Sequence, residues 1–275
     1  MGEAAGDGAA PEPNAGDRRI AQAFAQRRGR AALMPYLMGG FPDMATSRSI
    51  GEAYADNGAD LIELGVPFSD PLADGPVIHA AGTAALRAGA TLEGVLGVAE
   101  ALAPRLPVVL MCYVNVVLAR GTGAFAHAAR DAGVSGLIVP DLPLEEAPEI
   151  EQACADQGLA LVPLVAPTTP GERLAAIGAR ARGFLYTVSV TGTTGERTTG
   201  EDEFRSILER VRAHTSVPVA LGFGIATPEQ AAAAARAGAD GVIVGSRLVR
   251  AAAEADDPAR AAGDVVGALA AGLIG

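Results

Sequence analysis

Three stretches of the chain share one pattern, in which a helical segment stops at a glycine and an apolar run follows. They read "NGADLIELG" from Asn57, "AGVSGLIVP" from Ala132 and "AGADGVIVG" from Ala237. Apolar runs without polar alternation are typical of strands that are buried on both faces of a parallel sheet. Glycine is a common residue just after the end of a helix. The repeated unit is therefore a helix, a glycine stop and a buried strand.

Similar apolar runs recur along the chain between Ala-rich segments with helical periodicity. About eight alternations of strand and helix favour an α/β fold of the TIM (β/α)8 barrel type, and the pattern alone leaves a doubly wound sheet as the alternative. A length of 275 residues suits one barrel domain. We expect strands at 33–38, 61–64, 108–112, 136–139, 159–164, 183–188, 217–221 and 241–244.

The N-terminal stretch "MGEAAGDGAAPEPNAGD" has low hydrophobicity and lacks the apolar region of a signal peptide. We expect residues 1–18 to form a disordered leader and residues 19–275 to form the catalytic barrel. The apolar stretches of the remaining chain are interrupted well before the roughly 20 residues that span a bilayer, so no membrane segment is expected.

The formal net charge of -11 opposes a general affinity for nucleic acid. Cys112 and Cys154 lie in apolar runs, which predicts two buried free thiols and a cytoplasmic protein.

The sequence contains no lysine, so its positive side chains are all arginines. Chemistry through a Schiff base is thereby excluded, because it needs an amine that arginine cannot supply. The histidines His79, His127 and His214 are far apart in the sequence, and no metal site is expected. Carboxylates remain as the groups for acid-base chemistry.

Acidic residues gather in the stretch "LIELGVPFSDPLADGP", which runs from the second predicted strand into the loop after it. Catalytic groups of a TIM barrel lie at the C-terminal ends of its strands. Glu63 ends the strand, and burial should raise the pKa of its carboxyl toward values useful for proton transfer. The alternative is structural, with Glu63 paired to an arginine and with Asp70 and Asp74 forming turns. Other polar residues at strand ends are Tyr113, Asn115, Asp141 and Tyr186.

Two glycine-containing segments follow the last two predicted strands, "GFGIATPEQ" from Gly222 and "GSRLVR" from Gly245. Backbone amides and a helix start at this place of a barrel often bind phosphate, although the glycines could simply form turns. The polar loop "VSVTGTTGERTTG", 188–200, is long enough for a lid or a plain surface loop.

Together, "ELGVPFSDPLADGP", "MCYVN", "VPDLP", "YTVSVTGTTG", "GFGIATPEQ" and "GADGVIVGS" resemble the alpha subunit of tryptophan synthase, and the likeness covers about residues 31–273. The resemblance implies a lyase of tryptophan biosynthesis that cleaves indole-3-glycerol phosphate to indole and glyceraldehyde 3-phosphate by a retro-aldol reaction. It implies Glu63 as the acid-base residue and Asp74 as the partner of the indole N–H.

The resemblance also implies further site residues. Around the phosphate it places Gly195, Phe223, Gly224, Gly245 and Ser246. Tyr186 and Thr194 would lie near the glycerol end, Tyr36 and Phe223 would line the pocket, Tyr113 would contact the substrate, and Asp70 and Asn115 would couple the loops to a partner.

The implied partner is the beta subunit of tryptophan synthase, in an alpha2beta2 heterotetramer. The family passes indole to that subunit, which holds pyridoxal phosphate, so no cofactor is expected on this chain. The sequence departs from the family pattern at Gly40-Phe41, at Val114, and at Tyr36, where Phe is often found. These departures concern the pocket more than the reaction type.

Three alternative functions remain at the level of sequence. A stand-alone lyase would release free indole without a partner. An idle barrel would serve only as a binding partner, which the intact Glu63 and Asp74 oppose. A prenyl transferase on a similar barrel would need a divalent cation held by the same acids.

Overall fold

The structure is a computed structural model that describes residues 12–27, 29–188, 201–222 and 224–274. Within these ranges, the strands are β1 Ala32–Met38, β2 Ile62–Gly65, β3 Val108–Met111, β4 Gly136–Ile138, β5 Ala160–Val162, β6 Leu164–Val165, β7 Leu185–Val188, β8 Val219–Gly222 and β9 Gly241–Val244. The helices are α1 Ala15–Ala25, α2 Met44–Asp56, α3 Pro76–Arg87, α4 Leu92–Leu102, α5 Val114–Arg120, α6 Thr122–Asp131, α7 Pro148–Asp156, α8 Gly171–Arg180, α9 Glu201–Arg212, α10 Pro228–Arg236, α11 Ser246–Glu254 and α12 Pro258–Gly272.

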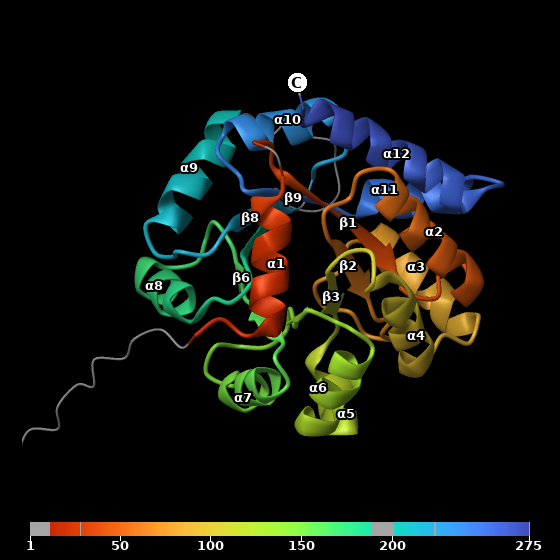
Figure 1. The fold of residues 1–275 in the computed structure, drawn as a ribbon, viewed down its shortest axis with the longest axis horizontal. Coiled ribbons are helices and arrows are strands. Elements are labelled where there is room, and N and C mark those ends of the chain that lie inside the picture. The colour runs from red at the N-terminus through yellow and green to blue at the C-terminus, as the bar shows by residue number, and fades with distance from the viewer. Residues whose placement is uncertain (1–11, 28, 189–200, 223, 275) are drawn as a thin grey trace, which may run out of the picture.

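The strands form one parallel sheet in the order β5-β4-β3-β2-β1-β9-β8-β7-β6. Each neighbour in this order is the next strand along the chain, except that β1 pairs with β9. Helices surround the strands on the outside (Figure 1). This arrangement is a TIM barrel and confirms the predicted fold class, because a doubly wound sheet would reverse its strand order.

The fifth predicted strand, 159–164, is divided in the structure into β5 and β6 by Pro163. Proline has no N–H to donate to a neighbouring strand, so the ladder is interrupted there. β5 pairs with β4, whereas β6 pairs with β7, and the Pro163 carbonyl accepts a hydrogen bond from the Tyr186 N–H at 3.0 Å. The two short strands therefore occupy one position of the barrel, at which it closes.

The three predicted glycine stops end helices α2, α6 and α10. Gly58, Gly133 and Gly238 have φ angles of 99°, 74° and 104°, in the left-handed region that favours glycine. In each case the N–H after the glycine bonds a carbonyl five residues earlier, as in a Schellman motif. These bonds run from Ala59 to Tyr54, from Val134 to Ala129 and from Ala239 to Ala234. The repeated sequence pattern thus encodes the same turn three times.

Helix α1 covers the N-terminal end of the barrel, and its position corrects the predicted leader of residues 1–18. The helix begins at Ala15, after a capping box in which Asn14 and Asp17 exchange side chain to backbone hydrogen bonds. The Asn14 amide also donates to the Leu159 carbonyl at 2.8 Å. Residues 15–18 are therefore helical, and the predicted boundary at 18/19 is wrong; residues 1–11 lie outside the described part of the chain.

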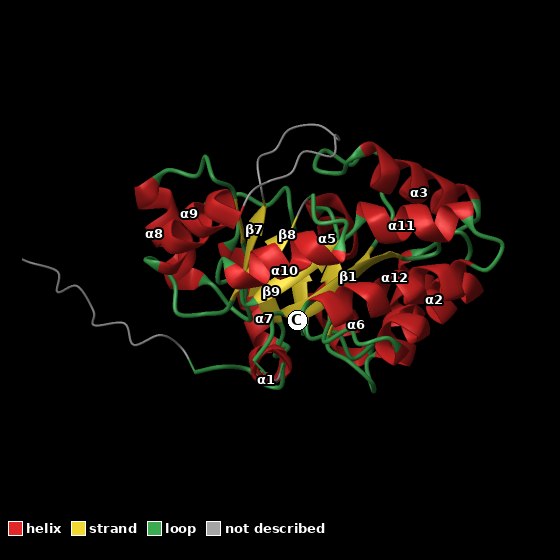
Figure 2. Ribbon diagram, turned by 90° about the horizontal axis from the view of Figure 1, so that it is seen from above, coloured by secondary structure: helices red, strands yellow, loops and turns green. Residues whose placement is uncertain are grey.

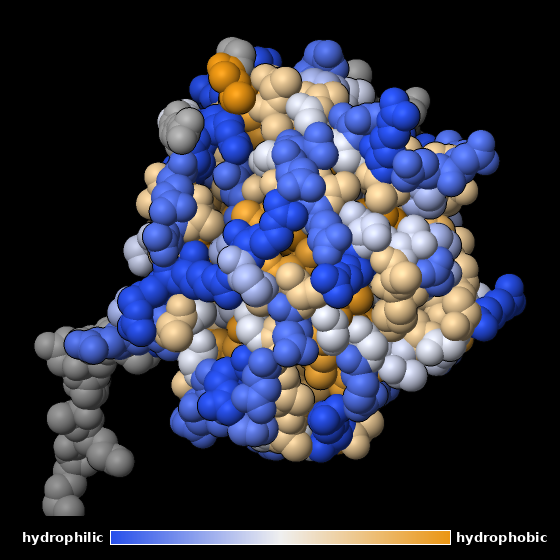
Figure 3. All heavy atoms as spheres, turned by 45° about the vertical axis from the view of Figure 1, so that its right-hand side comes forward, coloured by the Kyte–Doolittle hydropathy of each residue, from blue (hydrophilic) through white to orange (hydrophobic). Residues whose placement is uncertain are grey.

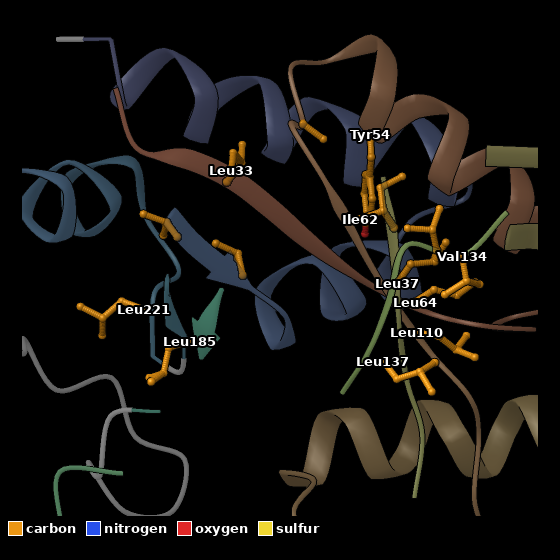
Figure 4. Packing of buried hydrophobic residues seen from close by; sticks show 14 of the residues in the cluster. Leu33, Leu37, Tyr54, Ile62, Leu64, Leu110, Val134, Leu137, Leu185 and Leu221 are labelled. Atoms are coloured by element: carbon orange, nitrogen blue, oxygen red, sulfur yellow. The ribbon is translucent and has the colours of Figure 1, made fainter. Parts of the chain in front are cut away.

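Apolar side chains of the described residues pack in two main layers and in a smaller cluster around Tyr36 that includes Met38, Ile78 and Val249. The inner layer lies inside the barrel and includes Met34, Leu61, Val109, Phe184 and Ile243, with Ile20 and Phe24 of α1 packed against its lower end. The outer layer lies between strands and helices; Figure 4 shows Tyr54, Ile62 and Leu64 among its members. As predicted, Cys112 and Cys154 are buried free thiols, and both belong to this outer layer.

The outer surface carries both polar and apolar side chains. On the face drawn in Figure 3, polar side chains stand out, and apolar residues show mainly between them. None of the helices in the described ranges is long and apolar enough to cross a membrane.

Replacing Phe24 by alanine should lower the free energy of unfolding by about 3–5 kcal/mol, because the lower end of the barrel loses a buried ring. The ring centroid of Phe24 lies 5.6 Å from that of Phe184. Leu118→Ala is the control, since that side chain is 53% exposed, and it should change stability by less than about 0.5 kcal/mol. Urea unfolding measures both, and a Phe24→Ala protein as stable as the control would contradict the role of α1.

Candidate active site

Alternate residues along each strand point into the barrel, and this places a polar layer above the apolar inner layer. Tyr36 lies two residues after Met34, and Glu63 lies two residues after Leu61. Tyr36 pairs directly with Glu63 in the register between β1 and β2. Tyr186 belongs to the same layer and comes from β7, which is separated from β1 by β8 and β9 in the sheet. This layer is at the C-terminal end of the strands, at the opposite end from α1, which lies at the bottom of Figure 2.

Glu63 is an acid inside an apolar barrel. Its side chain is fully enclosed, with the residue 1% exposed. Burial raises the pKa of the Glu63 carboxyl to about 8, and the negative charge of Asp74 adds to the rise. Among the described residues, no ion pair involves this carboxyl, so within these ranges the structure does not support the alternative of a pair with an arginine. Glu63 is therefore protonated at neutral pH and able to donate and recover a proton.

Asp74 is held beside this layer by Tyr113. The Tyr113 hydroxyl donates to Asp74 Oδ1 at 2.9 Å and accepts from the Ala73 N–H at 3.0 Å. The ring of Tyr113 stacks on Phe68, with centroids 5.3 Å apart. Tyr113 thus contacts both ends of the loop that follows β2, and its observed role is to position that loop. The stack with Phe68 was not predicted, since sequence spacing carries no signal for it.

Two opposing effects act on the pKa of Asp74. Partial burial raises the pKa, whereas the hydrogen bond from Tyr113 and the charge of His79 lower it, and the net shift is upward. Two carboxyls that are near one another and largely out of water cannot both ionise easily. The pair therefore holds a proton near neutral pH, and Glu63 is the member with the greater burial.

Two tyrosines lean over glycines on the neighbouring strands. A Cβ added to Gly65 would lie 2.1 Å from Tyr36 Oη, and a Cβ added to Gly222 would lie 2.4 Å from the ring of Tyr186. Only glycine permits these close approaches. Both rings thus lie across the mouth of the barrel. Burial is the main cause that raises the pKa of each phenol, and the charge of Glu63 raises it further.

Glycines and a helix start lie after β8 and β9, as the phosphate prediction requires. Gly245 precedes α11, and Ser246 is the first residue of that helix. The N–H groups at a helix N-terminus attract anions. Gly224 is exposed and has a φ of 80°, so a β-branched residue there would be strained. Their role toward a phosphate stays a prediction.

Some predicted residues lie outside the described part of the chain. These are Thr194, Gly195 and Phe223, together with the predicted lid loop from residue 189 onward.

The two residues predicted to couple the loops to a partner are both exposed. Asp70 accepts a hydrogen bond from the Ser69 hydroxyl at 2.5 Å. Asn115 is the second residue of α5, whose first N–H, from Val114, is bound by Asp141 at 2.8 Å. Asp141 therefore fixes the start of α5 just after Tyr113. Between Asp70 and Asp74, Leu72 is 87% exposed.

A cavity of about 170 Å³ lies elsewhere, beside α7 and α8. Its charged side chains are mutually neutralised, since Arg173 pairs with Glu145 at 2.6 Å and Arg180 pairs with Glu151. The acid pair is not among its lining residues. Within the described ranges, no group of three His, Cys, Asp or Glu side chains is arranged to hold a metal ion. The polar layer with Glu63 is therefore the candidate active site.

Glu63→Gln should make the protein more stable at alkaline pH. The folded state keeps a proton that the unfolded chain releases near its usual pKa of 4.5, so wild-type stability falls as the pH rises from 4.5 to about 8. The loss amounts to at most about 5 kcal/mol. Glutamine removes this loss, so the variant should match wild type at pH 5 and exceed it by several kcal/mol at pH 9. Urea unfolding at both values tests this, and a difference independent of pH would contradict the raised pKa.

Comparison with known proteins identifies the family to which this site belongs. The family model described as tryptophan synthase alpha chain matches residues 22–270. The tryptophan synthase alpha chain of Prochlorococcus marinus (strain MIT 9313) is 51% identical over 227 residues, which cover 82% of this chain and 82% of that protein. That of Carboxydothermus hydrogenoformans is 51% identical over 235 residues, which cover 84% of this chain and 88% of that protein.

Solved structures agree with the sequence relatives. A structure of Mycobacterium tuberculosis tryptophan synthase superimposes with a TM-score of 0.87 at 40% identity, covering 95% of this chain and 99% of that chain. Tryptophan synthase subunit alpha from Legionella pneumophila str. Paris gives a TM-score of 0.86 at 34% identity, covering 96% and 99%. The family model and the relatives name the alpha chain, and the solved structures are of tryptophan synthase; the chain belongs to the tryptophan synthase alpha chain family.

Proposed function

We propose that the chain catalyses the retro-aldol cleavage of indole-3-glycerol phosphate to indole and glyceraldehyde 3-phosphate. The observation that carries the proposal is the buried Glu63 carboxyl beside Asp74, with a pKa of about 8 for Glu63. The reaction needs one group that first donates and then accepts a proton, and a second group that stabilises positive charge. Neither task requires a lysine or a metal ion.

Glu63 acts twice in the proposed reaction. Its carboxylic acid first protonates C3 of the indole, which gives the indolenine cation. The resulting carboxylate then removes the proton from the side-chain hydroxyl next to C3. The C–O bond becomes a carbonyl, the bond from C3 to this carbon breaks, and its electron pair restores the indole ring. Glu63 ends in its starting protonated form, so protons and electrons balance.

Asp74 accepts a hydrogen bond from the ring N–H and stabilises the positive charge of the indolenine. Its Oδ1 is already bound by Tyr113, which leaves Oδ2 for the substrate. The hydrogen bond from Tyr113 favours the ionised form of Asp74. Tyr113 therefore acts on the reaction by positioning and ionising Asp74.

The phosphate of the substrate would bind at the start of α11, through Gly245 and Ser246, with Gly224 beside it. The positive end of the helix dipole and the free N–H groups suit a dianion. Thr194, Gly195 and Phe223, which lie outside the described part of the chain, complete this part of the proposal on the basis of the family resemblance alone.

The partner would be the tryptophan synthase beta subunit, in an alpha2beta2 heterotetramer in the cytoplasm. Pyridoxal phosphate would belong to the beta subunit, and this chain would hold no cofactor. The exposed side chains of Asp70 and Leu72 on the loop after β2, and of Asn115 at the start of α5, suit a contact with that subunit. No observation favours the stand-alone lyase.

The direct test is indole formation from indole-3-glycerol phosphate, with and without beta subunit. Glu63→Gln should lower kcat by at least about 10²-fold, because proton transfer is lost while the shape is retained. For wild type, kcat/KM should fall as the pH rises above about 8, since the free enzyme must hold the proton of Glu63.

Glu145→Gln is the matched control, because Glu145 is an exposed carboxylate paired with Arg173. It should retain wild-type turnover. Near-normal turnover by Glu63→Gln would exclude Glu63 as the acid-base residue, and wild type without any indole formation would contradict the proposed reaction. Equal turnover with and without beta subunit would instead favour the stand-alone lyase.

A further inference from the structure

The hydroxyl of Tyr36 is a buried hydrogen-bonding group with only a weak partner. Within the described chain, its one hydrogen bond is to the thioether sulfur of Met38 at 3.8 Å. Thioether sulfur is a weak acceptor, and buried hydroxyls normally have a stronger partner. The equally buried Tyr54 follows that rule, because its hydroxyl donates to the Tyr36 carbonyl at 3.2 Å. Tyr36 Oη therefore keeps hydrogen-bonding capacity for another molecule.

The backbone directs this hydroxyl into the site. Tyr36 is paired with Glu63 in the strand register, and both side chains point into the barrel. The phenol leans toward β2 and lies over Gly65, the next inward-facing residue after Glu63. A side chain at Gly65 would collide with Oη at 2.1 Å. The hydroxyl is thus held above Glu63, on the side of the loop that carries Asp74.

The groups around Tyr36 keep its hydroxyl protonated. Burial raises the pKa of the phenol well above its usual value, and Asp74, Glu63, Tyr113 and Tyr186 add to the rise. The charged and phenolic groups of the site therefore all favour the protonated form of Tyr36. The hydroxyl can therefore meet a substrate bound at the two carboxyls only as a neutral donor or acceptor.

In the proposed reaction, neither carboxyl donates a hydrogen bond to the substrate oxygen that loses its proton. Glu63 removes the proton of the side-chain hydroxyl, and Asp74 accepts a hydrogen bond from the ring N–H. The oxygen that loses its proton to Glu63 gains negative charge until the carbonyl has formed. A hydrogen-bond donor aimed at such an oxygen stabilises the transition state more than the ground state.

We propose that Tyr36 is a further catalytic residue, whose hydroxyl donates a hydrogen bond to the substrate oxygen deprotonated by Glu63. The proton of Tyr36 stays on the phenol throughout, so the proton balance of the cleavage is unchanged. This inference rests on the proposed function and adds a specificity element to it. A substrate without the reacting hydroxyl has nothing for Tyr36 to bind.

The test compares Tyr36→Phe with wild type in the presence of beta subunit. Kinetics of indole formation give kcat and KM, and calorimetry gives the Kd of an analogue that lacks the reacting hydroxyl. Tyr36→Phe should lower kcat by at least about tenfold, because a donor to developing charge is lost. KM and the Kd of the analogue should stay within about twofold, because the ring remains in place.

Tyr54→Phe is the matched control, since it also removes one buried phenol hydroxyl but on the outer face of β1. It should lower thermal stability and leave kcat within about twofold of wild type. The proposal is overturned if kcat of Tyr36→Phe equals that of wild type, or if the variant loses affinity for the analogue as strongly as it loses turnover. Absence of indole formation by wild type would instead overturn the proposed reaction, and the role of Tyr36 with it.

Discussion

The site depends on the cost of holding a carboxyl group inside an apolar barrel. Glu63 points inward from β2, between the apolar inner layer and the mouth of the barrel. Water cannot solvate its charge there, so the proton is retained to a pKa of about 8. The same carboxyl on the surface would be ionised at neutral pH and could not act as an acid. Catalytic capacity is thus obtained at the expense of folding stability at alkaline pH.

The remaining structure keeps that environment dry and ordered. Helix α1 closes the lower end of the barrel through Ile20 and Phe24, and the outer layer packs helices on the strands. At the upper end, the loop that carries Asp74 is fixed by Tyr113 through two hydrogen bonds. The second carboxyl therefore depends on loop order, whereas Glu63 depends on the strand register. This division makes Asp74 the member of the pair that a partner or a substrate can influence.

The sequence predicts the barrel well, because buried parallel strands and their glycine stops leave a strong local pattern. It also places Glu63, since an acid at the end of such a strand is unusual. The sequence predicts element boundaries less well where tertiary contacts determine them. The capping box of Asn14 starts a helix at Ala15, within the predicted leader, and Pro163 divides one predicted strand between two neighbours. The position of the weakly bonded Tyr36 hydroxyl is known only once the register over Gly65 is known.

The most direct measurement is a titration of the Glu63 carboxyl by carbon-13 NMR, in wild type and in Asp74→Asn. We expect a pKa near 8 for Glu63 in wild type. In the variant the pKa should be lower but still above 4.5, because burial is the larger cause and the charge of Asp74 the smaller one. A wild-type Glu63 that titrates near 4.5, or a pKa that Asp74→Asn leaves unchanged or raises, would contradict the coupled, buried pair.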